Sequence, residues 1–241
     1  MSDENDLALA VREVIEPGGD RHRGMRRLIT EVARRAGSSR AGGTGRWLAE
    51  LVMDVAVPIP IRDLATLQAH HPGVVDAQLA AALVRNASVA TGTVGALGGV
   101  LAAAETFTPP LWLAWPVQLV AETVAVVAVE LKLLAELQEV YGRPVTGTAT
   151  QRGATLVQAW AQRRGVRLDV TTPGGFRSPL TSTTMRRQLS QQLLRRLGRN
   201  SSTLLPFLVG AAAGAELNRR ATRAIGEAVM ADLTRGAPSA C

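Results

Sequence analysis

The chain has 241 residues, a net charge of +7 and a hydrophobic fraction of 46%, so it is long enough to bury a core and too apolar to be intrinsically disordered. Aromatic residues make up only 3%, so Ala, Leu and Val must supply that core, which favours close helix–helix packing. The one cysteine, Cys241, excludes a disulfide framework and a thiolate metal cluster within the chain.

The first 45 residues predict two amphipathic helices and a linker. Apolar residues recur at helical spacing over 2–16 and 21–36, and Pro17-Gly18-Gly19 separates the two runs. Residues 37–45 are mostly Gly, Ser and Thr, which is typical of a flexible linker. We therefore place a domain boundary at 37–45. It separates an N-terminal helical extension (1–36) from an all-helical domain (46–236), and residues 237–241 form a disordered tail.

A rigid extended segment follows the next predicted helix, at 47–56. Pro58 and Pro60 enforce an extended backbone, and a short helix over 61–70 comes after them. We assign this segment no role beyond that of a rigid link.

His70-His71 ends the short helix and raises the question of a metal site with Asp54, Asp63 and Asp76. Adjacent side chains point about 100° apart on a helix, so two neighbouring histidines rarely reach one ion. We expect the pair to cap the helix, and we predict no metal ligand.

Two long helices form the apolar centre of the chain. The first, over 75–104, is uncharged in its last 19 residues. The second, over 116–141, is apolar on nearly every side, and a helix of that kind is buried in protein or in lipid. Towards its end, Lys132, Glu136 and Glu139 predict a solvated face.

Glycines on these helices predict close packing. Gly95 and Gly99 lie four residues apart on one face of the first long helix. Gly210 and Gly214 repeat that spacing in a final helix that runs to about Leu233. Such faces let another helix backbone approach closely.

Pro109-Pro110 lies between the two long helices. A bilayer crossing needs about 20 predominantly apolar residues, and the uncharged windows here are borderline. The two helices could form a re-entrant hairpin in one leaflet or the centre of a soluble bundle. We expect membrane contact rather than a full span.

Charge is unevenly divided along the chain. Residues 49–145 carry four basic and nine acidic side chains, whereas 146–241 carry fourteen arginines and four acids. This pattern indicates an anionic partner for the C-terminal third. Residues 151–199 offer only Trp160 and Phe176 for base stacking, so we expect that partner to be lipid and not nucleic acid.

A basic helix predicted over 184–197 is the candidate lipid contact. An apolar residue recurs at every fourth position, and basic residues beside such a stripe suit an anionic membrane surface. A helix docked by its leucines with solvated arginines is the alternative. The candidate contact residues are Arg186, Arg187, Arg195 and Arg196.

Glu105, Glu122 and Glu130 interrupt apolar helices. A carboxylate there is costly unless it is protonated, paired or hydrated. These acids could carry protons or bind a cation, or they could pair with arginines of the C-terminal third, which is the interpretation we favour.

Three stretches resemble the EcsC family of bacterial proteins, which is named after a protein encoded beside an ABC transporter. They are the small-residue helix 86–104 with its proline turn, the Tyr-Gly helix end at 137–142, and the proline–glycine–glycine–asparagine pattern within 205–218. The similarity spans roughly 75–235. It implies an all-helical, membrane-associated protein without an established activity, and it transfers no catalytic residue.

We find no catalytic, nucleotide-binding or zinc motif, so we predict no catalytic residue and no cofactor. The acidic stretch 2–6 has no apolar run beside it, so we expect no signal peptide and a location at the cytoplasmic face of the membrane. The expected function is that of a non-enzymatic accessory to a transporter or envelope process. The alternatives are a soluble scaffold that binds a partner helix through its glycine faces and, remotely, a hydrolase that uses a buried Glu.

Overall fold

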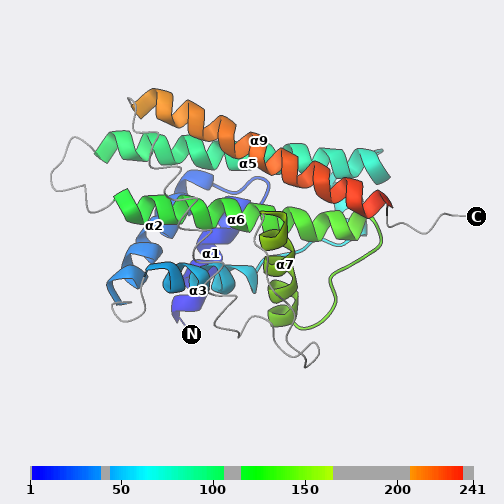
Figure 1. Ribbon diagram of the computed structural model, residues 1–241, viewed down its shortest axis with the longest axis horizontal. Coiled ribbons are helices and arrows are strands. Elements are labelled where there is room, and N and C mark those ends of the chain that lie inside the picture. Colours follow the sequence, from blue (N-terminus) through cyan, green and yellow to red (C-terminus); the bar gives the residue numbers. More distant parts are fainter. Residues whose placement is uncertain (1, 39–43, 106–114, 165–206, 236–241) are drawn as a thin grey trace, which may run out of the picture.

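Four stretches, 2–38, 44–105, 115–164 and 207–235, are described by the computed structural model (Figure 1). Within them the chain is helical and contains no strand, which confirms the all-α prediction. The helices are α1 (Ser2–Ile15), α2 (Arg21–Ser38), α3 (Thr44–Ala56), α4 (Leu64–His70), α5 (Asp76–Glu105), α6 (Trp115–Val140), α7 (Ala149–Arg163) and α9 (Phe207–Arg235).

Most observed helices begin and end within a few residues of the predicted bounds. Local signals explain this agreement. Asp63 caps α4 and accepts a hydrogen bond from the Thr66 backbone N–H at 2.8 Å, and Thr148 forms a capping box with Gln151 at the start of α7. The helix predicted over 184–197, the Pro109-Pro110 turn and the tail at 237–241 lie outside the described residues.

α6 is the central helix of the bundle (Figure 1). The helices α5 and α9 lie on one side of it, α1 and α3 lie on the other, and α7 runs across the layers. From Val120 to Leu137 every α6 residue except Glu122 is buried, as expected for a helix that is apolar on nearly every side.

The two N-terminal helices contribute to the same hydrophobic core as α6. Apolar residues recur at helical spacing on the inward face of each helix. The buried side chains include Leu7, Val14, Met25 and Leu28. α1 and α2 pack against each other, and both contact α6. The predicted linker is shorter in the structure, because α2 continues to Ser38 and α3 begins at Thr44.

Glycines bring α5 and α9 close together along an antiparallel pair. A methyl group added at Gly95 would lie 3.0 Å from the Gly214 carbonyl oxygen, and one at Gly92 would lie 3.3 Å from the Ala215 carbonyl oxygen. At the other end of the pair, a methyl group on Gly226 would collide with the Val84 side chain at 2.6 Å. The predicted close approach is therefore confirmed at Gly95 and Gly214, whereas the surroundings of Gly99 and Gly210 lie outside the described part of the structure.

Across the described stretches, none of the helices combines the length with the apolarity that a membrane crossing requires.

Candidate functional site

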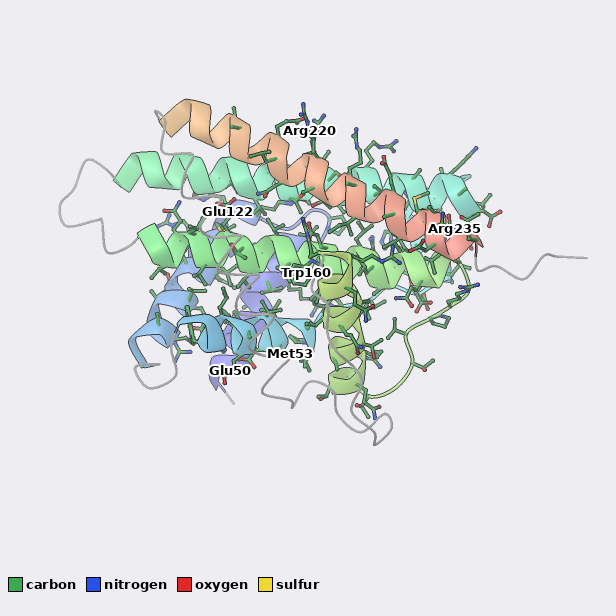
Figure 2. The ribbon with its side chains drawn as sticks, viewed as in Figure 1. Glu50, Met53, Glu122, Trp160, Arg220 and Arg235 are labelled. Carbon is green, nitrogen blue, oxygen red and sulfur yellow. The ribbon has the colours of Figure 1, made fainter. Side chains whose placement is uncertain are left out.

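Glu130 lies completely buried at the middle of α6 and binds residues of two other helices. Its Oε2 accepts a hydrogen bond from Trp160 Nε1 at 2.7 Å, and its Oε1 accepts one from Thr222 Oγ1 at 2.9 Å. The Arg164 guanidinium, just beyond the end of α7, forms an ion pair with the same carboxylate. The arrangement ties α6 to α7 and α9, and Figure 2 labels Trp160 where α7 meets α6.

These contacts compensate the cost of burying the Glu130 carboxylate. Burying a lone carboxylate is very costly, whereas one that is paired and hydrogen-bonded at both oxygens is tolerated. Because Arg164 is an arginine of the C-terminal third, its ion pair confirms the pairing interpretation for Glu130. Both oxygens of Glu130 are engaged by groups that hold the bundle together.

Glu122, the second predicted carboxylate, is half-buried where α5, α6 and α9 meet. Its Oε1 accepts a hydrogen bond from Asn218 Nδ2 at 3.1 Å. The Asn218 backbone carbonyl in turn accepts a bond from Thr91 Oγ1 at 3.4 Å. Asn218 also lies beside Gly95, so this polar contact accompanies the close approach of the glycine-faced helices.

The remaining predicted site residues lie beyond what the structure describes. The backbone of Glu105 ends α5, but its side chain is outside the described part. The four arginines of the predicted lipid contact, Arg186, Arg187, Arg195 and Arg196, also lie outside it.

A second buried charged cluster lies further along α6, and here the sequence prediction was wrong. Lys132 and Glu136 are buried, with exposed fractions of 5% and 3%, and do not form a solvated face. Arg62 donates two hydrogen bonds to the Glu136 carboxylate, at 2.7 and 2.8 Å. Lys132 Nζ lies 2.8 Å from the same carboxylate and donates to the Pro60 carbonyl at 2.5 Å.

The proline segment explains this difference. It begins with a turn at 57–58 and lies over α6, where Pro60 and Arg62 bind Lys132 and Glu136. Ile59 is buried in the same core, so the segment covers the face that the charges alone suggest is solvated. The hydrogen bonds to Glu136 also raise the pKa of Arg62 above its usual value. The segment thus supplies hydrogen-bond partners to the buried charges of Lys132 and Glu136.

Sequence reasoning missed Arg62 as a partner. A signal was present, because only four basic residues stand against nine acids over 49–145. Each basic side chain in that region is therefore a candidate counter-ion for an acid on α6.

His70 and His71 lie at the end of α4, as predicted. His70 is the last residue of the helix, and the His71 backbone N–H donates to the Gln68 carbonyl. Over the described stretches, His, Cys, Asp and Glu side chains form no group of three that could hold a metal ion.

The outward surface of the α5 and α9 pair is the remaining candidate site. We call it the α5–α9 outer face. Its basic members are all exposed, and two large apolar side chains, more than half exposed, lie at its edges, one on each helix. Two acids, Glu216 and Glu227, also lie on α9 there. The face consists of Arg85, Val89, Leu217, Arg219, Arg220 and Arg223.

Comparisons of the chain with protein-family models, with curated proteins and with solved structures found no match in any of the three.

Proposed function

We propose that this protein is a non-enzymatic helical protein that binds the anionic cytoplasmic surface of a membrane, as an accessory to a transporter or envelope process. The separation of charge carries the proposal. Glu122, Glu130 and Glu136 of α6 are engaged inside the bundle. The C-terminal third, in contrast, has ten more arginines than acids, and α9 presents exposed arginines. Each basic residue near anionic headgroups contributes about 1 kcal/mol of binding energy.

The engagement of the buried acids supports a non-enzymatic role. A general acid or base must reach its substrate within hydrogen-bond distance. Glu130 instead lies at 0% exposure and holds Trp160 and Thr222. These contacts favour a structural use of the carboxylate over the hydrolase alternative.

The observed packing also weighs against the scaffold alternative. That alternative needs a glycine face that can receive a partner helix. Gly92 and Gly95 are covered by α9, and Gly214 lies against α5, so the chain itself occupies these faces.

Vesicle co-sedimentation tests the proposal. The full chain is mixed with vesicles of phosphatidylcholine alone or with phosphatidylglycerol at about 30%. We expect binding only to the anionic vesicles and release at about 1 M salt, where the Debye length falls to about 3 Å. Protein that stays in the supernatant with both compositions would overturn the proposal.

Cell fractionation then separates the modes of association. Protein released from membranes by a salt wash supports electrostatic docking, and protein released only by detergent supports insertion of an apolar segment. A fully soluble chain supports the scaffold alternative.

A further inference from the structure

We infer that the α5–α9 outer face is the surface that lies on the membrane, with its arginines on lipid phosphates and with Val89 and Leu217 entering the headgroup layer. This inference rests on the proposed function and adds to it which surface is used and how the molecule is oriented.

The register of the two helices brings Arg219 and Arg223 of α9 beside Arg85 and Val89 of α5, whereas Leu217, two residues before Arg219, lies on the other flank of α9. A methyl group on Gly92 would lie 3.5 Å from Cβ and 3.8 Å from Cδ of Arg219, so the Arg219 stem lies across α5 at that position. Arg85 and Val89 precede Gly92 by two turns and one turn of α5, on the same side of the helix. On α9, Arg223 follows Arg219 by one turn, which brings it towards Val89.

The arginines of the face differ in whether they form an ion pair with an acid. Arg219 and Arg220 share one acid, Glu216, at 3.4 and 2.6 Å. Within the described part of the chain, Arg85 and Arg223 form no ion pair. Guanidinium groups in that situation bind phosphate oxygens readily, in a bidentate geometry that suits a lipid headgroup.

The apolar members of the α5–α9 outer face favour a lipid surface over a nucleic acid as its partner. Within the described stretches, four large apolar side chains are exposed: Leu9, Val75, Val89 and Leu217. Two of these four lie on this face, at 52% and 56% exposure. A membrane interface accepts apolar side chains beside basic ones. A nucleic acid gains little from them, and the face has no aromatic side chain on which a base could stack.

The position of the face in the fold fits this orientation. α9 crosses α5, and its Phe207 end lies farther from α6 than α5 does (Figure 1). Arg220 projects away from α6 (Figure 2). The 29 residues of α9 give a rod of roughly 40 Å. Laid flat, that rod brings the basic and apolar members to the surface together.

A site-specific probe tests the orientation. In a Cys241→Ser background, a bimane label is placed at Leu217→Cys or Val89→Cys, and at Leu9→Cys as the control. Leu9 is 48% exposed and lies on α1, on the other side of α6. With anionic vesicles that carry a headgroup-level nitroxide quencher, we expect a blue shift and quenching at 217 and 89 but not at 9. Equal signals at all three positions, or a signal at 9 alone, would overturn the inference.

Charge variants of the full chain supply a second measurement. Arg85→Gln, Arg219→Gln and Arg223→Gln are combined in one variant, and Arg12→Gln, Arg23→Gln and Arg26→Gln, exposed on α1 and α2, in the control. At about a factor of five per arginine, we expect roughly 100-fold weaker partitioning for the first variant and at most a few-fold for the control. Circular dichroism checks that both variants are folded.

The outcomes separate the inference from the proposed function. Failure of the unmodified chain to bind anionic vesicles removes both. Binding that survives the outer-face variant but is lost on neutralising Arg186, Arg187, Arg195 and Arg196 keeps the function and overturns the inference. A bimane signal at Leu217 with a DNA duplex and none with vesicles overturns the inference in favour of a nucleic-acid surface.

Discussion

Among the described residues, two neighbouring acids of α6 differ in their surroundings. Glu136 binds Arg62 and Lys132. One turn along, burial raises the pKa of Glu139, and the negative charge of Asp63 raises it further. The protonated form of Glu139 is therefore favoured in the folded chain relative to the unfolded chain.

This shift predicts how stability depends on pH. Because the folded pKa is raised, the charged form of Glu139 costs stability above that pKa, and the cost disappears as the pH falls below the unfolded value of about 4.3. We expect Glu139→Gln to unfold at a higher temperature than the unmodified chain at pH 7, and the difference to close at about pH 4. Thermal unfolding at the two pH values measures it, and a lower midpoint for the variant at pH 7 would contradict the assignment.

The acids of the candidate site could be predicted from the sequence, but their partners could not. An acid in an apolar helix stands out by its cost, which identifies Glu122 and Glu130. The partners of Glu130 lie 30, 34 and 92 residues further along the chain, and no local pattern encodes such pairings. Lys132 and Glu136 were misassigned for the same reason, since the cover over them comes from 72 to 74 residues away.

Two facing glycines on α5 and α9 differ in the space around them. A methyl group on Gly95 would lie 2.8 Å from Asn218 Nδ2 and 3.0 Å from the Gly214 backbone. A methyl group on Gly214 would meet only the Gly95 carbonyl oxygen, at 4.0 Å. The helix pair therefore requires glycine on one side of the crossing and not on the other.

Alanine substitution distinguishes the two glycines. We expect Gly95→Ala to lower the free energy of unfolding by about 1–3 kcal/mol, because α9 must move away. We expect Gly214→Ala to leave it unchanged or to raise it by up to about 1 kcal/mol, through the better helix propensity of alanine. Urea denaturation measures both variants, and equal losses would show that the crossing is not as close as described.

The positions of the helices could be predicted from the sequence because the signals that start and end a helix are local. Periodicity and prolines indicated where most helices lie. The caps Asp63 and Thr148 were not used in the prediction, and α4 begins at Leu64 after its cap and not at 61. The pairing of α5 with α9 was predicted only as a capacity for close approach, since glycine spacing does not specify the partner helix.

The whole molecule is held by a core that runs through α6 and includes the N-terminal helices. Side chains of α1 and α2 that are at most 2% exposed include Leu7, Val11, Met25 and Leu28. Each such side chain contributes about 1.5–3 kcal/mol on burial, while a typical domain has only about 5–15 kcal/mol of net stability. Without these two helices, little of the net free energy of unfolding would remain.

Truncation tests whether residues 1–36 are separable from the rest. We expect a chain that begins at residue 37 to lose its cooperative thermal transition, because α6 loses the cover that α1 and α2 provide. Removal of 236–241 is the control and should leave the midpoint unchanged. A sharp transition in the shortened chain would instead establish 46–236 as an independent domain.

Lys132 is the only lysine of the chain, and its ammonium group is enclosed beneath the proline segment. Acylating reagents attack free amines, so the folded protein shields its one side-chain amine. Acylation at this position then proceeds at a rate set by how often the segment lifts from α6. The rate of Lys132 acylation, followed by mass spectrometry, therefore reports how often this segment opens, and it needs no engineered label.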